Sequence, residues 1–153
     1  HPHCRRQRQM CIRDRNHVSA VKADGSGEVA WENISRVYVP SMIVYKDYIY
    51  AVMDNGNAMC WNSKTGKNMW RERLNRTTSA SPVMVKDRIY AIDETGNFSV
   101  FSANPEEFKI LAKNKIGDQA FATPVICDSK IFVRVAEIIE GKRQEFLYCI
   151  GEK

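Results

Sequence analysis

The chain repeats itself at an interval of about forty residues. The segment Tyr48–Ala51 returns 40 positions later as Arg88–Ala91, and a Gly-Asn pair follows both copies at the same distance. A third copy begins at Pro124–Ile126, 42 positions after Pro82–Met84. Self-similarity at this period is typical of arrays of one supersecondary unit, none of which buries its apolar faces alone. The repeat therefore constrains the architecture before any motif is considered.

The first fifteen residues do not share this repeat. Residues 5–15 match the translation of a common sequencing-adaptor DNA residue for residue, and residues 1–4 precede them as a barcode region. Residues 1–15 hold five Arg and one Asp, so they account for most of the net charge of +5. The alternative is a basic arm that binds nucleic acid. We expect residues 1–15 to be a non-native, disordered tail, and we expect no nucleic-acid partner.

From residue 16 onwards the chain has the pattern of a β-protein. Short runs rich in Val, Ile, Tyr and Phe alternate with turn signals about every 8–12 residues. Asp54-Asn55-Gly56-Asn57 is a strong hairpin signal, because Asn and Gly tolerate a positive φ. Two units of four strands are expected: Ile43–Tyr45, Tyr48–Met53, Ala58–Trp61 and Asn68–Leu74, and then Pro82–Val85, Arg88–Asp93, Asn97–Ala103 and Lys109–Ile116.

Four short antiparallel strands in about forty residues are typical of one blade of a β-propeller. The sequence divides into a half blade over residues 16–36, whole blades over 37–76 and 77–117, and three strands of a closing blade over 118–153. We therefore expect an all-β fold, a β-propeller fragment of three to four four-stranded antiparallel blades. It would be the C-terminal part of a larger propeller of about eight blades.

The cysteines after the tail fit this repeat as packing residues. Cys60, Val100 and Cys149 fall in one column, on the third strand of their units. A column that takes Cys and Val predicts a small, buried side chain, and Cys127 is expected to be buried as well. Cys60 and Cys149 lie two blades apart, so no disulfide is expected between them.

A turn motif recurs at the ends of two units. Thr65-Gly66 is followed by Trp70, four residues after the glycine, and Trp31 likewise stands four residues after Gly27. In these residues the chain resembles the pyrroloquinoline-quinone (PQQ)-like β-propellers, over about residues 18–153. The resemblance implies that each Trp docks against the next blade near such a glycine, with its indole N–H donating to a carbonyl. Gly27, Trp31, Thr65, Gly66 and Trp70 are thus the expected blade-docking residues.

Both whole blades depart from this motif. Asn62, in the blade over residues 37–76, stands where the repeat has Asp. In the following blade, residues 104–107 contain no Thr-Gly pair and Ile110 stands where Trp would fall. The pattern is therefore only partly kept along the chain.

The resemblance implies two possible functions. The family includes quinoprotein dehydrogenases and non-enzymatic members such as the BamB-type lipoprotein of outer-membrane assembly. We expect a non-catalytic fragment with a protein-interaction or scaffold role in the bacterial cell envelope, in the periplasm or otherwise outside the cytoplasm. Its partners would be proteins and the missing blades of the propeller. The alternative is a fragment of a PQQ-dependent quinoprotein dehydrogenase whose active-site residues lie on other blades.

Candidate chemistry is sparse in the sequence. Quinone enzymes of this fold use adjacent cysteines, calcium and an acidic base, and no two cysteines here are adjacent. The run from Asp24 to Glu28 reads as a polar hairpin turn rather than a calcium loop. Asp93-Glu94 is an acid–base candidate, but its place in the repeat predicts a solvated turn. We therefore expect no catalytic residue, no metal ligand and no cofactor; PQQ and calcium belong to the alternative only.

Overall fold

The structure is a computed structural model of the chain, and it describes residues 17–151. The prediction for residues 1–15 lies outside the described residues. Within the described range the secondary structure consists of thirteen strands and no helix. No helix there is long and apolar enough to span a membrane. The strands are β1 (Val18–Val21), β2 (Val29–Asn33), β3 (Ile43–Tyr45), β4 (Tyr48–Val52), β5 (Asn57–Asn62), β6 (Asn68–Arg73), β7 (Val83–Val85), β8 (Arg88–Ile92), β9 (Asn97–Ser102), β10 (Ile110–Lys115), β11 (Val125–Cys127), β12 (Lys130–Ile139) and β13 (Lys142–Ile150).

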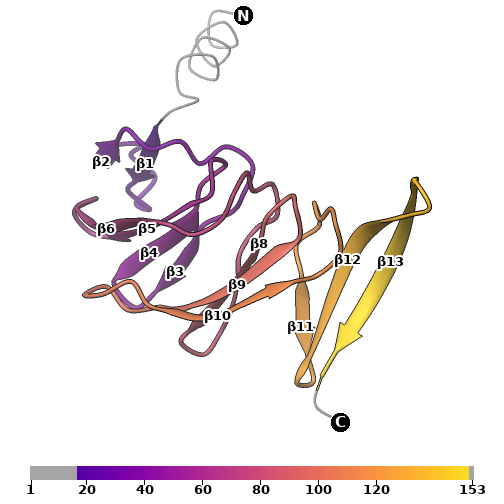
Figure 1. Cartoon of the computed structure of the whole chain (residues 1–153). Coiled ribbons are helices and arrows are strands. Elements are labelled where there is room, and N and C mark those ends of the chain that lie inside the picture. Colours follow the sequence, from indigo (N-terminus) through magenta and orange to yellow (C-terminus); the bar gives the residue numbers. More distant parts are fainter. Residues whose placement is uncertain (1–16, 152–153) are drawn as a thin grey trace, which may run out of the picture.

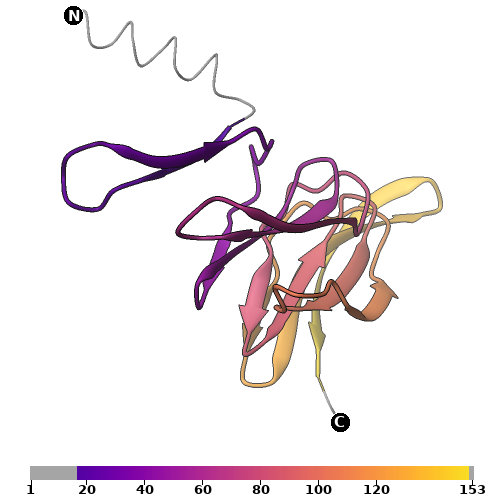
Figure 2. The same cartoon turned by 90° about the vertical axis from the view of Figure 1, so that its left-hand side faces the viewer.

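These strands form four antiparallel sheets in which neighbours in sequence are neighbours in space. We call them the N-terminal hairpin (β1–β2), the first blade (β3–β6), the second blade (β7–β10) and the last sheet (β11–β13). The sheets follow one another across the molecule in sequence order (Figure 1), and the N-terminal hairpin extends beyond the others in the turned view (Figure 2). The expected all-β architecture of four-stranded antiparallel blades is confirmed.

The strand ends follow from the turn residues. In the first blade the Met53 N–H donates to the Asn57 carbonyl at 2.8 Å, and the Asp93 N–H donates to the Asn97 carbonyl at 3.0 Å in the second blade. Gly56 and Gly96 adopt positive φ values of 81° and 79° at these hairpins. Because the same turn closes both hairpins, β4 and β8 end one residue earlier than the sequence indicated.

Three apolar clusters hold the sheets together, one at each interface between neighbouring sheets. Ala51 and Trp61 belong to the cluster at the first interface, which includes Trp31 of the N-terminal hairpin. Val52, beside Ala51, belongs to the second cluster, between the two blades. Successive residues of a strand point to opposite faces, so a single central strand supplies two interfaces. The third cluster joins the second blade to the last sheet through Val133 and Val135.

A repeated hydrogen bond links the segments that lead into the innermost strands. The Ser41 N–H donates to the Ser81 hydroxyl at 2.9 Å, and the Ser81 N–H donates to the Thr123 hydroxyl at 3.0 Å. These residues precede β3, β7 and β11 by two positions. The contact therefore passes from each sheet to the next at one repeat position.

The cysteine prediction holds for only one of the three. Cys60 is fully buried, whereas Cys127 and Cys149 are exposed, so their expected burial is wrong. Val125 and Cys127 of β11, like Cys149 of β13, lie on the face of the last sheet that points away from the second blade, which we call the outward face. No described residue forms a further sheet over this face. Cys60, Val100 and Cys149 occupy the same repeat position. The side chain at this position is buried only where another sheet packs over it.

Candidate functional site

The first expected docking residue, Trp31, contacts the turn at the end of the first blade. Its indole N–H donates to the Ser63 carbonyl at 2.8 Å. A Cβ added at Gly66 would lie 2.6 Å from the indole carbon Cδ2, and Gly66 has a φ of 68°. The glycine is thus required twice at this position, for its backbone conformation and for the space that the indole occupies.

Thr65 and Asn62 shape the turn that receives this indole. The Asn62 side-chain oxygen accepts from the N–H groups of Lys64 and Thr65, at 3.0 and 3.1 Å, and from the Thr65 hydroxyl at 3.1 Å. The amide oxygen therefore makes the contacts that the usual Asp of the motif would make here, as Asx turns generally do. Thr65 acts within the turn and is exposed.

Trp70 makes the corresponding contact at the second interface. Its indole N–H donates to the Asn104 carbonyl at 2.8 Å, and the side chain is 8% exposed. The segment after β9 has no glycine beside the ring; instead Phe108 lies 5.1 Å away between ring centroids, and Phe101 meets it edge-on at 6.4 Å. Phe108 was missed by the sequence reasoning, because it lies outside the strands, where no periodic pattern marks a buried residue.

Gly27, the remaining expected residue, is placed differently. It lies in the exposed turn between β1 and β2 with a φ of 73°, and an added Cβ would meet no atom within 4 Å. Four of the five expected residues therefore lie at or beside an interface between sheets, and Gly27 serves only its own turn among the described residues.

Asp93 is a second correction to the sequence reading. The expected solvated turn is wrong, because its side chain is fully buried. One carboxylate oxygen accepts from the N–H groups of Thr95 and Asn97 at 2.9 Å and from the Thr95 hydroxyl at 2.8 Å. The other accepts from the Asn97 amide at 2.8 Å and from the Arg76 N–H at 3.1 Å. Asp93 thus joins the second blade to the segment that leaves the first.

The environment of Asp93 also decides its protonation. Burial acts to raise the pKa of this carboxyl, but hydrogen bonds from Asn97, Arg76 and Thr95 outweigh it and hold the pKa below its usual value. The residue is therefore a charged structural acceptor whose lone pairs are occupied. A general base needs free acceptor capacity toward a substrate, which Asp93 lacks.

The neighbouring blade uses Asp54 in a related way, at the surface. Its carboxylate accepts from the Tyr38 N–H at 2.8 Å and from the Val39 N–H at 3.1 Å. The backbone of this segment is thereby fixed while the Tyr38 and Val39 side chains are 65% and 53% exposed.

Three segments connect one sheet to the next, namely residues 34–42, 74–82 and 116–124. Hydrogen bonds link them to the hairpins at residues 53–56 and 93–96. We call the side that they form the loop face.

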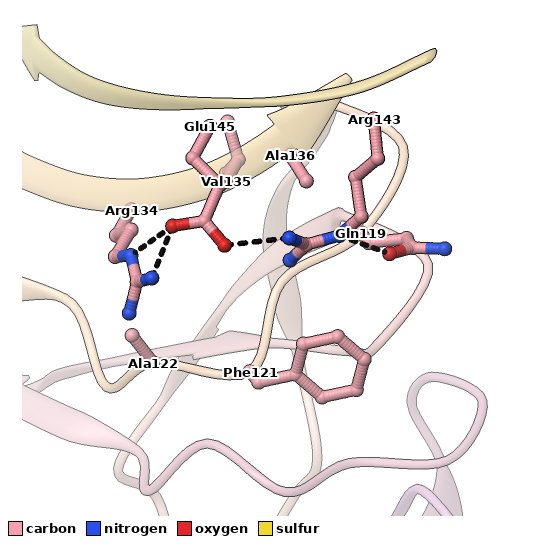
Figure 3. A pocket seen from close by; sticks show the side chains of 8 residues that line it. All are labelled: Gln119, Phe121, Ala122, Arg134, Val135, Ala136, Arg143 and Glu145. Carbon is pink, nitrogen blue, oxygen red and sulfur yellow. Dashed lines mark hydrogen bonds and ion pairs between the residues drawn. The ribbon is translucent and has the colours of Figure 1, made fainter. Parts of the chain in front are cut away.

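A row of hydrogen-bonded charged side chains lies on the outward face of the last sheet (Figure 3). Arg134 Nε donates to Glu145 at 2.8 Å, Arg143 Nη1 donates to the other Glu145 oxygen at 2.6 Å, and Arg143 Nε donates to Gln119 Oε1 at 3.0 Å. The Arg134 and Arg143 hydrogen bonds hold the pKa of the Glu145 carboxyl below its usual range. These residues and Phe121, which is 52% exposed, line a hollow of ≈ 60 Å³.

The repeat shows why this cluster is unusual. Arg134 follows Ile92 by 42 positions, and Ile92 follows Val52 by 40. Val52 and Ile92 are fully buried at the second and third interfaces. The last sheet therefore carries an arginine where each blade carries an apolar side chain that packs on its successor.

The buried titratable groups are poorly suited to catalysis. Burial raises the pKa of the Cys60 thiol to about 11, so the reactive thiolate is scarce near neutral pH. Burial likewise raises the pKa of the Tyr50 hydroxyl, with a further contribution from Cys60. Within residues 17–151 no group of three His, Cys, Asp or Glu side chains is placed to hold a metal ion.

Comparison with known proteins gives a family and a fold. The family model described as "Outer membrane protein assembly factor BamB" matches residues 14–106. The solved structure of BamB from Moraxella catarrhalis superposes with a TM-score of 0.66 at 12% identity, over 87% of this chain and 46% of that one. A europium-containing methanol dehydrogenase gives a TM-score of 0.56 at 15% identity, over 66% of this chain and 21% of that one. No curated protein matches significantly. The chain thus spans less than half of either structure, and identities this low show a shared fold alone.

Proposed function

Because the chain belongs to the PQQ-like β-propeller family of the outer membrane protein assembly factor BamB, we propose that it is a non-catalytic scaffold that binds other proteins. We place this role in the bacterial cell envelope, outside the cytoplasm. The proposal assigns two kinds of partner to two surfaces. Further blades of the same propeller would cover the outward face, and a separate protein would bind the loop face.

The proposal rests on where the reactive and the large apolar side chains lie. The carboxylate of Asp93 is fully hydrogen-bonded within the fold, and the Cys60 thiol is buried. Large apolar side chains, in contrast, are exposed on the loop face at Tyr38, Val39 and Phe121. Exposed apolar groups on a fixed backbone are a usual property of protein-binding surfaces.

The outward face supports the assignment of further blades. Leu147 is 72% exposed and Val125 is 59% exposed on this face, whereas the counterparts of Leu147 in the two blades, Ala58 and Phe98, are buried. An open face of this kind is unfavourable in water. We infer that a further blade packs there and meets the arginines with a carboxylate or carbonyl group.

We further propose that the chain binds neither PQQ nor calcium. Calorimetric titration of the chain with each is expected to give no saturable heat at micromolar concentrations. The alternative is a fragment of a quinoprotein dehydrogenase. What supports it is the fold that this chain shares with the methanol dehydrogenase structure, and nothing more. Micromolar binding of PQQ, or dye-linked alcohol oxidation by the loaded chain, would establish that alternative and overturn the non-catalytic assignment.

The interaction role is tested by site-specific photo-crosslinking in envelope fractions. A photo-reactive residue at Tyr38 is expected to capture a defined envelope protein, because this side chain is exposed on a fixed segment of the loop face. The control position is Asp87, in the exposed turn between β7 and β8 at the other end of the strands. The captured protein is then purified, and Tyr38→Ala is expected to weaken its binding at least about tenfold. Equal capture from both positions would contradict the assignment.

A further inference from the structure

A cationic groove lies at the outer rim of the loop face, between the two blades. It has a volume of ≈ 480 Å³ and is formed where the chain leaves β6 and where β9 and β10 meet. Its charged lining residues are Arg76, Lys113 and Lys115, and none of its lining residues is acidic. A space of this size accommodates several side chains of a ligand.

Two of these cations are available for a ligand. Arg76 and Lys113 are exposed, and neither forms an ion pair with another residue in the described part of the chain. The Lys115 ammonium donates to the Thr95 carbonyl, which fixes its position at the end of the groove. The first blade has the same contact, since Arg73 donates to the Asn55 carbonyl at 2.7 Å. The fold thus sets one cation in place and leaves two others unpaired beside it.

A buried side chain at the same groove has spare hydrogen-bonding capacity. Asn75 is 8% exposed, and its amide oxygen accepts from the Ser99 hydroxyl at 2.7 Å. Its amide nitrogen has no partner among the described residues. A buried donor without a partner is unfavourable, and an acceptor brought by a ligand, directly or through water, would satisfy it.

The strand beside the groove adds a third feature. β10 is the outermost strand of the second blade, all six of its side chains are exposed, and its outer edge has no partner strand within residues 17–151. An extended segment that pairs with such an edge points alternate side chains to one face. Lys113 and Lys115 also alternate in this way, opposite Ser99 and Asn97 of β9.

From these features we propose that the groove binds an acidic, extended peptide segment of a partner protein. The segment pairs with β10, and its alternate carboxylates meet Arg76 and Lys113 while the groove accepts their side chains. Charge complementarity of this kind gives specificity and fast association. The inference rests on the proposed scaffold role and adds the chemistry of the partner, at a site separate from Tyr38.

The test uses the whole chain and a fluorescein-labelled peptide of alternating Glu and Val, about six residues long. Fluorescence anisotropy is expected to show saturable binding that weakens with added salt, since exposed charges are screened. The same peptide with Gln in place of Glu is expected to bind at least about tenfold more weakly. Equal binding of the two peptides would overturn the proposal, as would the absence of saturable binding up to millimolar peptide.

Variants locate the site. Arg76→Gln with Lys113→Gln is expected to weaken binding of the Glu peptide at least about tenfold. The matched control is Lys109→Gln, an exposed cation next to β10 that does not line the groove. Circular dichroism confirms that each variant is folded. Equal losses in the control and the double variant would overturn the site, as would tighter binding of single-stranded DNA than of the Glu peptide. A groove variant that loses the peptide but keeps capture at Tyr38 separates this inference from the scaffold role.

Discussion

The second blade and the last sheet are built on the same repeat but differ in how many of their faces are covered. Ile92 and Val100 of the second blade are buried because the last sheet packs over them. The equivalent residues of the last sheet are Arg134 and Cys149, and both are exposed. The repeat therefore fixes which way each side chain points, whereas the adjoining sheet decides whether it is buried.

The comparison also explains the residue types. An apolar or hydrogen-bonded side chain is favoured between two sheets, since an unpaired polar group there is costly. Asp93 meets this condition through its bonds to Thr95, Asn97 and Arg76. On the outward face, Arg134 and Arg143 share one carboxylate and remain in contact with water. Substitutions on covered and open faces should therefore differ sharply in effect.

The largest effect is expected for Trp70→Ala at the covered second interface. Removing a buried Trp costs about 3–5 kcal/mol through lost burial and the cavity left behind. The indole here also gives up its hydrogen bond to Asn104. Urea melts of the variant should show a large fall in midpoint or no folded baseline. An unchanged midpoint would show that the indole does not hold the two blades together.

Asp93→Ala is expected to destabilise the chain by about 2–3 kcal/mol, because it leaves the N–H groups of Arg76 and Asn97 without their acceptor. The wild-type contribution depends on pH. The folded pKa of Asp93 is lowered, so its stabilisation is present above the unfolded value and is lost as the pH falls through the folded one. Thermal melts of both proteins between pH 7 and acid pH should converge as the carboxyl is protonated. A constant difference would contradict the assigned charge.

Gly66→Ala and Gly27→Ala form a matched pair. Both glycines have a positive φ, of 68° and 73°, so each substitution carries strain of about 1 kcal/mol. Only at Gly66 would the new Cβ collide with Trp31, at 2.6 Å. We expect Gly66→Ala to lower the free energy of unfolding by about 2 kcal/mol and Gly27→Ala to lower it by about half of that. Equal losses in urea melts would mean that the indole moves aside without cost.

The smallest effect is expected for Leu147→Ser on the open face. Leu147 is 72% exposed and shares its face with Arg134. Surface substitutions of this kind usually change stability by less than about 0.5 kcal/mol. The substitution would lower stability more if a further blade covered this face. The effect is therefore measured as the urea midpoint of this chain alone. A clear loss would show that the outward face is already packed.

Much of this architecture was accessible from the sequence, because local signals specify it. Turn residues such as Gly56 and Gly96 bound the strands, and the period locates the interfaces. Partners that are distant in sequence were not accessible. Asp93 occupies a column in which Met53 and Val135 are buried and apolar, which was the available signal for its burial. Its partner Arg76 comes from the preceding linking segment, and no local pattern places the two together.

The contacts from Ser41 to Ser81 and from Ser81 to Thr123 have a consequence for how such a protein changes length. Ser81 accepts from the preceding segment through its hydroxyl and donates to the following segment through its N–H, so the link has a direction. Consider a repeat unit that begins and ends at these hydroxyl positions. If such a unit were duplicated or lost, the N–H of one segment would still meet a hydroxyl of the next. A boundary elsewhere in the repeat would leave one N–H and one hydroxyl without each other. We therefore expect duplication or loss of a unit to be tolerated best when the boundary lies at this hydroxyl column.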